Sequence, residues 1–389
     1  MEYDLIVVGA GFSGSVIAER ISATTEKKVL VIEIRDHIGG NCFDYKDKNG
    51  IIIHKYGPHL FHTNKAHVWK YLSRFTAWHP YEHKVLANVD NKLVPLPFNL
   101  NTLREMYEEP QAELLKRKLI ERFGYGTRVA ITELKQDSDV QLKQLGKLVF
   151  EKFFLNYTTK QWGCAPHEIS QEVLSRVPVV ISHDDRYFHD KYQFMPVDGY
   201  TSIFEKMLSS NNIDVLLSTN ALDLLSLDKT NKTIYFNGKV FKGHLVFTGT
   251  VDSLFGYSEG ELPYRSLQFE FTELGRDRFQ PATTVNYPNT NEYTRITEFK
   301  NIYSNDSVRT TIVKEYPQDY DRNNAEKNIP YYPILNQANK DTYEKYKQIC
   351  SLFPQMTLTG RLAEYRYYNM DDVIDKALRV ANDLVDSSL

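Results

Sequence analysis

The N-terminal positions alternate between apolar runs and one helix-forming stretch. Asp4–Val8 is typical of a buried strand, Ser13–Ala23 of a helix, and Val29–Glu33 of a second buried strand. A strand, a helix and a strand in this order predict a parallel βαβ unit.

The periodicity becomes helical between about Asn101 and Thr158, where glycine and proline are sparse. Gln111–Phe123 and Val140–Leu155 both carry apolar residues at three- and four-residue spacing, which is the spacing of one helix face. We therefore expect a separate helical subdomain in this region.

Strand patterns dominate the later part of the chain. Asn237-Gly238 is a hairpin turn signal between the short apolar runs Ile234–Phe236 and Lys239–Phe241. Further strands are expected at Leu245–Thr248, Ser266–Phe271, Thr294–Phe299 and Val308–Val313. An amphipathic helix is expected at Met370–Val385.

The composition mainly argues against several classes of protein and site. The chain has 389 residues, too many for one compact core, and 47 Lys+Arg against 50 Asp+Glu give no basic excess that would favour nucleic acid or anionic lipid. Cys42, Cys164 and Cys350 form no CxxC, which argues against a disulfide framework or a thiolate metal site. No apolar run approaches the roughly 20 residues of a membrane helix. We expect a cytoplasmic protein without a membrane span or a metal.

A glycine motif stands between the first strand and the first helix. Gly9-Ala10-Gly11-Phe12-Ser13-Gly14 fits GxGxxG, whose glycines allow a tight turn, close approach of a pyrophosphate and close helix–strand packing. Glu33 ends the second strand, where a carboxylate accepts hydrogen bonds from a ribose hydroxyl. The strand–turn–helix–strand context makes this motif a strong signal for a dinucleotide.

Further glycines favour FAD over NAD. Ile38-Gly39-Gly40-Asn41 resembles the glycine doublet of glutathione-reductase-like flavoproteins, and Thr359-Gly360-Arg361 resembles their segment that returns to the flavin, with Gly249 as a third contact. The expected fold class is α/β, with an FAD-binding Rossmann-like domain of the glutathione-reductase type, an inserted helical domain and an antiparallel β-sheet substrate domain. The expected boundaries are 1–75, 210–255 and 335–389 for the FAD-binding domain, 101–155 for the helical domain, and 76–100, 156–209 and 256–334 for the substrate domain.

Several segments together, spread nearly end to end, resemble the bacterial UDP-galactopyranose mutases. They are His54-Lys55-Tyr56-Gly57-Pro58-His59-Leu60-Phe61-His62-Thr63, Asn156-Tyr157-Thr158-Thr159-Lys160-Gln161-Trp162-Gly163, Ser175-Arg176-Val177-Pro178 and Tyr293-Thr294-Arg295-Ile296. The histidines of the first segment have no Cys or carboxylate at metal-ligand spacing. Without the resemblance, Tyr157 and Trp162 would read as core residues.

The resemblance implies a role for each matching residue. Arg176, Arg295 and His59 are the implied catalytic residues, the arginines because a departing and returning diphosphate needs forked, permanently charged donors. The implied substrate-binding residues are Phe153, Phe154, Tyr157, Thr158, Trp162, Arg176, Tyr187, His83, Asn286, Arg295, Tyr316, Tyr367 and Asn369. The implied cofactor-binding residues are Gly9, Gly11, Phe12, Ser13, Gly14, Glu33, Gly40, Asn41, His59, Leu60, Gly249, Arg361, Tyr368 and Met370. His83 and Asn369 depart from the family, where several members have Asn and Asp.

The implied activity is the interconversion of UDP-galactopyranose and UDP-galactofuranose for cell-surface polysaccharide. In this family, N5 of reduced FAD attacks the anomeric carbon, so the cofactor supplies the covalent chemistry. The resemblance also implies a homodimer and an external reductant such as NAD(P)H or a flavin reductase. The alternatives are a UDP-N-acetylgalactosamine mutase, a flavin amine oxidase or desaturase, and a non-enzymatic escort protein built on the same flavoprotein fold.

Overall fold

The computed structural model describes residues 2–163, 178–303, 305–324 and 328–387. Its central element is a parallel sheet in the order β12-β2-β1-β16-β22. The strands are β1 (Leu5–Val8), β2 (Val29–Ile32), β12 (Ile213–Leu216), β16 (His244–Phe247) and β22 (Met356–Leu358). The expected βαβ unit is confirmed, because β1 and β2 pair in parallel and helix α1 (Phe12–Thr24) connects them in the sequence.

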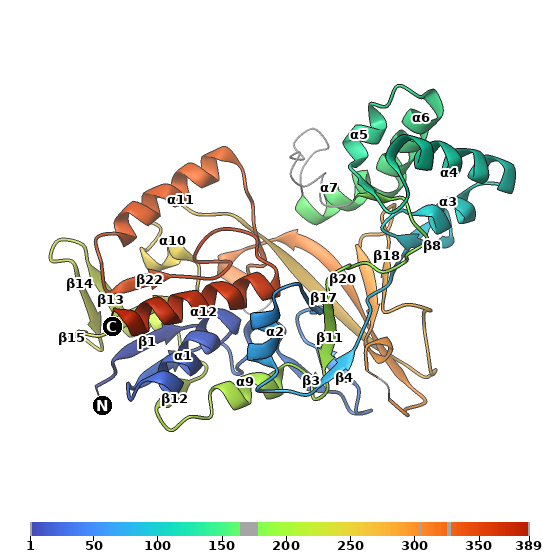
Figure 1. Ribbon diagram of the computed structural model, residues 1–389. Helices are drawn as coiled ribbons and strands as arrows, with labels where there is room; N and C mark the ends of the chain where they lie inside the picture. The colour runs from blue at the N-terminus through green and yellow to red at the C-terminus, as the bar shows by residue number, and fades with distance from the viewer. Residues whose placement is uncertain (1, 164–177, 304, 325–327, 388–389) are drawn as a thin grey trace.

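Both faces of this sheet are covered, which explains why the neighbouring strands β1 and β2 are apolar at every position. Leu5 and Val7 of β1 lie in one core cluster, and Ile6 between them lies in another. The first face carries α1, α2 (Ala66–Leu72), α9 (Thr201–Met207) and α12 (Met370–Asp386). The second carries α10 (Val251–Leu254), α11 (Gln337–Cys350) and the small sheet of β13 (Leu225–Asp228), β14 (Thr233–Phe236) and β15 (Lys239–Val240). Figure 1 shows α12 lying beside α1, with both chain termini at this side of the molecule.

A seven-stranded sheet adjoins the parallel sheet, in the order β21-β17-β20-β19-β18-β7-β8. Its strands are β7 (Val85–Val89), β8 (Lys92–Leu96), β17 (Tyr264–Leu274), β18 (Thr284–Asn286), β19 (Arg295–Glu298), β20 (Thr310–Asp319) and β21 (Tyr332–Pro333). All neighbours are antiparallel except β18 and β7. The prediction that a strand ends at Val313 was wrong: β20 continues to Asp319, because its full length pairs with the long strand β17.

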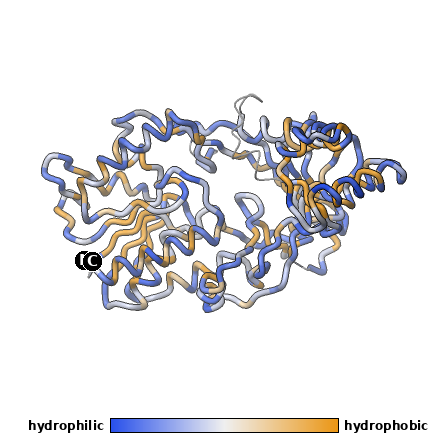
Figure 2. The backbone as a smooth tube through the Cα atoms, turned by 45° about the horizontal axis from the view of Figure 1, so that its top comes forward, coloured by the Kyte–Doolittle hydropathy of each residue, from blue (hydrophilic) through white to orange (hydrophobic). Residues whose placement is uncertain are grey.

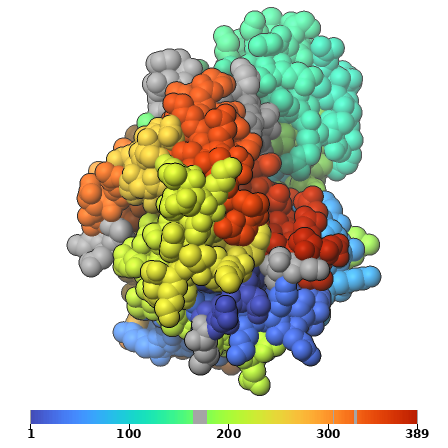
Figure 3. Space-filling model, turned by 90° about the vertical axis from the view of Figure 1, so that its left-hand side faces the viewer, coloured from blue at the N-terminus to red at the C-terminus, as the bar shows by residue number. Residues whose placement is uncertain are grey.

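The expected helical region is confirmed as a group of helices, whose apolar core also includes residues of β7 and β8. It contains α3 (Leu100–Met106), α4 (Glu109–Phe123), α5 (Ile131–Lys135) and α6 (Val140–Val149), followed by a π-helical turn at Phe150–Leu155 and by α7 (Asn156–Trp162). Asn99 begins α3 with a reciprocal capping box, and Asp139 caps α6. Figures 1 and 3 show α3–α6 projecting from the rest of the molecule, with α7 between this cluster and the strands.

Shorter elements connect these parts. They are the hairpin β3 (Asp44–Lys46) and β4 (Ile52–His54), the sheet of β5 (Phe61–Thr63), β11 (Tyr192–Pro196) and β6 (Trp78–Pro80), the pair β9 (Arg128–Val129) and β10 (Val179–Val180), and 3-10 turns at Gly40–Cys42, Ala221–Asp223, Phe299–Asn301 and Arg322–Asn324. Figure 2 shows hydrophobic positions along the adjacent strands of the parallel sheet and also within the helical cluster. Within the described ranges, no helix is long and apolar enough to cross a bilayer. The three-domain division stays a prediction.

Candidate active site

The glycine motif forms a crowded turn between β1 and α1. Gly9 has φ +102°, and a Cβ there would lie 2.1 Å from Oγ1 of Thr248; a Cβ on Gly14 would lie 1.9 Å from the carbonyl oxygen of Gly9. Gly11 differs, because its Cβ would meet only Cα of Gly40, at 3.7 Å. Two of the glycines are therefore required by the fold itself, while Gly11 leaves backbone open for close approach of a ligand.

Polar groups beside this turn fit a dinucleotide. Glu33 accepts a hydrogen bond from the backbone N–H of Ala10 (2.8 Å), which fixes its carboxylate against the glycine turn. Arg35 donates through Nη2 to Oδ1 of Asn41 (2.8 Å) and its guanidinium lies 4.3 Å from the centre of the Tyr56 ring, while its buried Nη1 has no hydrogen-bond partner among the described residues. A buried guanidinium N–H without an acceptor is costly, so this atom fits an oxygen-rich cofactor.

His59 lies close to two cationic residues. Its backbone N–H donates to Nδ1 of His54 (3.0 Å), and its own Nδ1 lies 3.0 Å from the carbonyl oxygen of Gly57. Burial lowers the pKa of His59 to about 3, and Arg361 and Arg295 act in the same direction. Since a carbonyl only accepts, Nδ1 of the neutral ring carries the proton and Nε2 has the free lone pair.

Arg295 is held by a carboxylate on the neighbouring strand. Its Nε lies 3.0 Å from Oε2 of Glu315, and the two residues are register partners of β19 and β20. The Arg295 side chain is 25% exposed whereas that of Glu315 is 2% exposed. The guanidinium therefore reaches solvent, and the carboxylate contacts it from the buried side. Burial acts to lower the pKa of Arg295, but Glu315 and nearby phenols raise it overall. The charge is therefore permanent and its direction fixed.

Tyr157, Tyr187 and Tyr332 lie close to Arg295, and two further rings lie beside Tyr332. Burial raises the pKa of Tyr157 and of Tyr187, and the charge of Arg295 opposes both shifts, which places the two phenols close to it. Burial raises the pKa of Tyr332 to about 12. Its ring stacks with that of Tyr367 at 6.1 Å and lies 6.2 Å from that of Trp162. These partly exposed rings (Tyr157, Trp162, Tyr187, Tyr332 and Tyr367) are here called the aromatic ring set.

Arg361 lies beside two rings of the aromatic ring set. It donates to the carbonyl oxygens of Tyr331 and Tyr368, and its guanidinium lies 5.4 Å from the centre of the Tyr332 ring and 5.5 Å from that of Tyr367. Met370 begins α12 and packs against the core below it.

His83 is buried beside the aromatic ring set. The hydroxyl of Tyr81 donates to Oγ1 of Thr283 (2.6 Å), so its oxygen accepts from Nδ1 of His83 (3.1 Å). Burial lowers the pKa of His83 to about 3, with Arg295 as the next cause. The ring is therefore neutral and its Nε2 is an acceptor.

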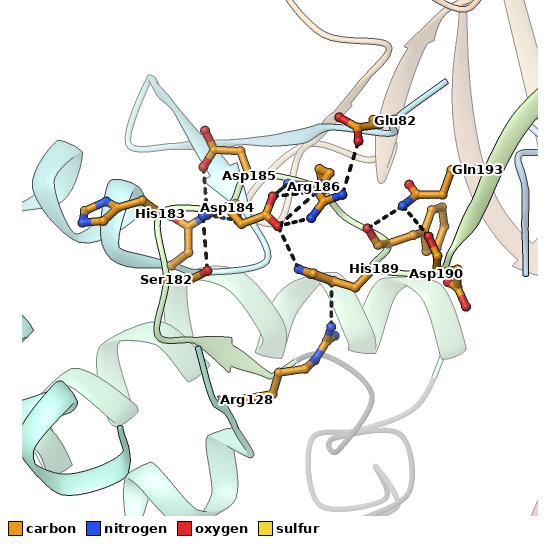
Figure 4. Close-up of polar contacts among 12 residues, drawn as sticks. Glu82, Arg128, Ser182, His183, Asp184, Asp185, Arg186, His189, Asp190 and Gln193 are labelled. Carbon is orange, nitrogen blue, oxygen red and sulfur yellow. Dashed lines mark hydrogen bonds and ion pairs between the residues drawn. The ribbon is translucent and has the colours of Figure 1, made fainter. Parts of the chain in front are cut away.

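A network on the loop before β11 fixes Tyr187. Arg186 binds both oxygens of Asp184 and reaches Glu82, while His189 lies between Asp184 and Arg128, as Figure 4 shows. Tyr187 follows Arg186 directly, and its N–H donates to the carbonyl oxygen of His83 (2.7 Å). This loop thereby presents Tyr187 from a rigid support.

Four other residues predicted from the sequence have the following positions. Tyr316 points to the opposite face of β20, where its hydroxyl donates to Oε2 of Glu270 (2.9 Å). Phe153 and Phe154 are buried in the core of the helical cluster. Asn369 is exposed at the start of α12. Arg176 lies outside the described residues.

The remaining predicted residues lie in the following elements. Phe12 and Ser13 begin α1, Leu60 follows His59, Thr158 is buried on α7, Asn286 ends β18 opposite Arg295, and Gly249 follows β16. Sequence reasoning missed Glu315, Tyr331 and Tyr332. The pair Tyr331-Tyr332 between two prolines was a usable signal, whereas the contact of Glu315 with Arg295 depends on strand register.

Comparison with known proteins agrees with this geometry. A family model described as UDP-galactopyranose mutase matches residues 152–367, and one described as an NAD(P)-binding Rossmann-like domain matches residues 7–75. The first covers more than half of the chain and includes both α7 and the Arg295–Glu315 pair. The chain belongs to the UDP-galactopyranose mutase family.

Relatives of this mutase family match over nearly the whole chain. A dTDP-fucopyranose mutase of Escherichia coli is 35% identical over 97% of this chain and 97% of its own. A UDP-galactopyranose mutase of Mycoplasma genitalium is 34% identical over 98% of this chain and 95% of its own. A crystal structure of reduced UDP-galactopyranose mutase covers 100% of this chain and 95% of its own with a TM-score of 0.75 at 18% identity, which supports the fold. As a member of this mutase family, the protein is an enzyme of the isomerase class.

Proposed function

We propose that this protein interconverts UDP-galactopyranose and UDP-galactofuranose. The observation that carries the proposal is Arg295, a partly exposed guanidinium fixed by Glu315 and lying beside the aromatic ring set. A forked cation suits a diphosphate, and flat aromatic faces suit a uracil base. Family membership and the full-length relatives support the same activity.

We infer that the cofactor is FAD, held at the glycine turn. Gly11 would let the pyrophosphate approach, Glu33 would accept from a ribose hydroxyl, and the unpartnered Nη1 of Arg35 would donate to a cofactor oxygen. Reduced FAD, when bound, supplies a nucleophile for a sugar rearrangement that has no net redox change.

The chain's own residues would bind and orient the substrate. Arg295, with Arg176 as the second arginine of the family pattern, would hold the diphosphate in one place during the rearrangement. Neutral His59 would offer the lone pair of Nε2 near the cofactor, as its hydrogen bond to Gly57 favours this tautomer. Phenols of the aromatic ring set would donate to phosphate and sugar oxygens.

The setting proposed for the enzyme follows from the family pattern. We place it in the cytoplasm as a homodimer that receives electrons from NAD(P)H or a flavin reductase and supplies galactofuranose for cell-surface polysaccharide. Cys42 and Cys350 are free and buried, which is compatible with a reducing compartment.

A second candidate substrate is dTDP-fucopyranose, because the E. coli relative with this activity is as similar as the UDP-galactopyranose mutases. The reduced enzyme should be incubated separately with UDP-galactopyranose, UDP-N-acetylgalactosamine and dTDP-fucopyranose, and the products separated by chromatography. The proposal expects a furanose product from UDP-galactopyranose. Turnover of dTDP-fucopyranose alone would transfer the assignment to that substrate.

A further inference from the structure

Lys160 on α7 is held by carbonyl oxygens instead of a carboxylate. Its Nζ lies 2.7 Å from the carbonyl oxygen of Tyr287, 2.8 Å from that of Asn291 and 3.4 Å from that of Tyr293. No acidic side chain in the described part of the chain forms an ion pair with it. An ammonium group has three N–H donors, so this arrangement uses all of them.

The three carbonyls belong to the loop that joins β18 to β19. This loop begins after Asn286 and ends before Arg295, two residues that face each other across the strand pair. Its base is closed by a hydrogen bond from the N–H of Tyr287 to the carbonyl oxygen of Thr294 (2.8 Å). The position of Lys160 therefore bears directly on the hairpin that carries Arg295.

The helix that carries Lys160 also carries Tyr157 and Trp162 of the aromatic ring set. A second cation fastens the same end of this helix, because Arg265 on β17 donates to the carbonyl oxygens of Gln161 (3.1 Å) and Lys160 (3.3 Å). Arg265 is neutralised by Asp319, whereas the described hydrogen-bond acceptors of Lys160 Nζ are all backbone carbonyls. Lys160 thus forms the direct polar link from α7 to the hairpin.

We propose that Lys160 is a positioning residue that sets the separation between the base-binding rings of α7 and the diphosphate-binding Arg295. This role rests on the proposed function, since it assumes that one nucleotide diphosphate spans both parts. Removing the ammonium leaves three loop carbonyls without their donor, so the hairpin and α7 would no longer be held at a fixed distance from each other. The effect should fall on substrate affinity, because the described hydrogen bonds of Lys160 Nζ all go to the loop that precedes Arg295.

The link also responds to pH. Burial lowers the pKa of Lys160 to about 8, well below its ordinary value of 10.5. The neutral amine has only two N–H donors for three carbonyls. The titratable and charged groups of the loop are Tyr287, Glu292 and Tyr293, and the strands beside it carry Arg265 of β17 and Lys314, Glu315, Tyr316 and Asp319 of β20. Burial is the cause of the Lys160 shift, so its loss of charge is expected near pH 8.

The test compares Lys160→Met and Lys160→Arg with the wild type and with Lys152→Met as a control. Lys152 lies two turns earlier, in the π-helical turn, and pairs only with the exposed Asp90. Binding of UDP to the FAD-loaded protein is measured by calorimetry between pH 6.5 and 9.5, together with KM, kcat and melting temperature. Lys160→Met should weaken UDP binding and raise KM about tenfold at pH 7 with kcat changed less than about twofold, because charged hydrogen bonds of ordinary strength correspond to such factors.

The pH profile separates a positioning role from general stability. Wild-type affinity should fall above about pH 8, while Lys160→Arg should keep its affinity to the end of the range, because arginine stays charged. Unchanged UDP affinity in Lys160→Met, or the same alkaline fall in Lys160→Arg and the wild type, would contradict the inference. Failure of the wild type to bind UDP at any pH would instead contradict the proposed function and, with it, this inference.

Discussion

Arg295 and Glu315 face each other across neighbouring strands of one sheet, with Nε of the arginine 3.0 Å from Oε2 of the glutamate. The contact is an ion pair, because neither Nε of Arg295 nor Oε1 of Glu315, both buried, has a hydrogen-bond partner in the described part of the structure. Glu315 thus has one principal role that the structure reveals, which is to fix the guanidinium that we assign to the diphosphate.

Replacement of Glu315 should weaken the binding of the substrate diphosphate by Arg295. In Glu315→Ala the guanidinium loses its ion-pair partner, so kcat/KM should fall about ten- to one-hundred-fold. Steady-state kinetics of the reduced enzyme measure this loss. Glu270→Gln, on the opposite face of the sheet, is the matched control and should stay near the wild type. Equal activity of Glu315→Ala and the wild type would refute the positioning of Arg295 by this carboxylate.

Tyr332 and Tyr316 distinguish the site seen in the structure from the site expected from the sequence. Tyr332→Phe removes a hydroxyl from the aromatic ring set and should lower kcat/KM about two- to tenfold, the size of one neutral hydrogen bond. Tyr316→Phe removes only a contact with exposed Glu270 and should leave kcat/KM unchanged. The two variants are compared in one assay. A larger loss in Tyr316→Phe than in Tyr332→Phe would restore the expectation drawn from the sequence.

Gly11→Ala should separate folding from cofactor binding. The added Cβ lies 3.7 Å from Cα of Gly40, an ordinary contact, so the protein should fold with a melting profile close to that of the apoprotein. The methyl group occupies the face where a pyrophosphate would approach, so most of the bound flavin should be lost. Visible absorbance of the purified protein reports this, with Gly275→Ala as a control whose Cβ meets nothing within 4 Å. Full flavin content in Gly11→Ala would contradict this binding site.

Buried neutral histidines should destabilise the fold in mild acid. Burial lowers the pKa of His54 and of His83 to about 3, while an unfolded histidine titrates near 6.5. Between these values the unfolded state binds more protons, so their contribution to stability is complete above about pH 6.5 and declines as pH falls toward 3. Each residue should cost about 2 kcal/mol between pH 7 and pH 5.

Urea unfolding of the wild type and of His83→Asn at pH 7 and pH 5 measures this cost. The variant lacks one titrating ring, so its loss of unfolding free energy should be about 2 kcal/mol smaller. An equal loss in both proteins would show that His83 titrates normally in the folded state.

The features that depend on local sequence pattern could be predicted from the sequence. The glycine turn, Glu33 and the parallel β1–β2 pair follow from spacing along one short segment. Their partners in space do not: the neighbours of β1 and β2 in the sheet come from residues 213–216 and 244–247, and Arg35 gains its isolated Nη1 only in the folded turn. Strand alternation decides that Glu315 faces Arg295 while Tyr316 faces away, and a one-residue shift of register would exchange them.

The most direct test of the central claim is an anaerobic assay of the purified protein with UDP-galactofuranose. Product formation is followed by chromatography, with the flavin either oxidised or reduced by dithionite. We predict conversion to UDP-galactopyranose only when the flavin is reduced. A yellow, folded protein that converts neither UDP-galactofuranose nor its N-acetyl analogue in the reduced state would contradict the proposed activity while leaving the fold unchanged.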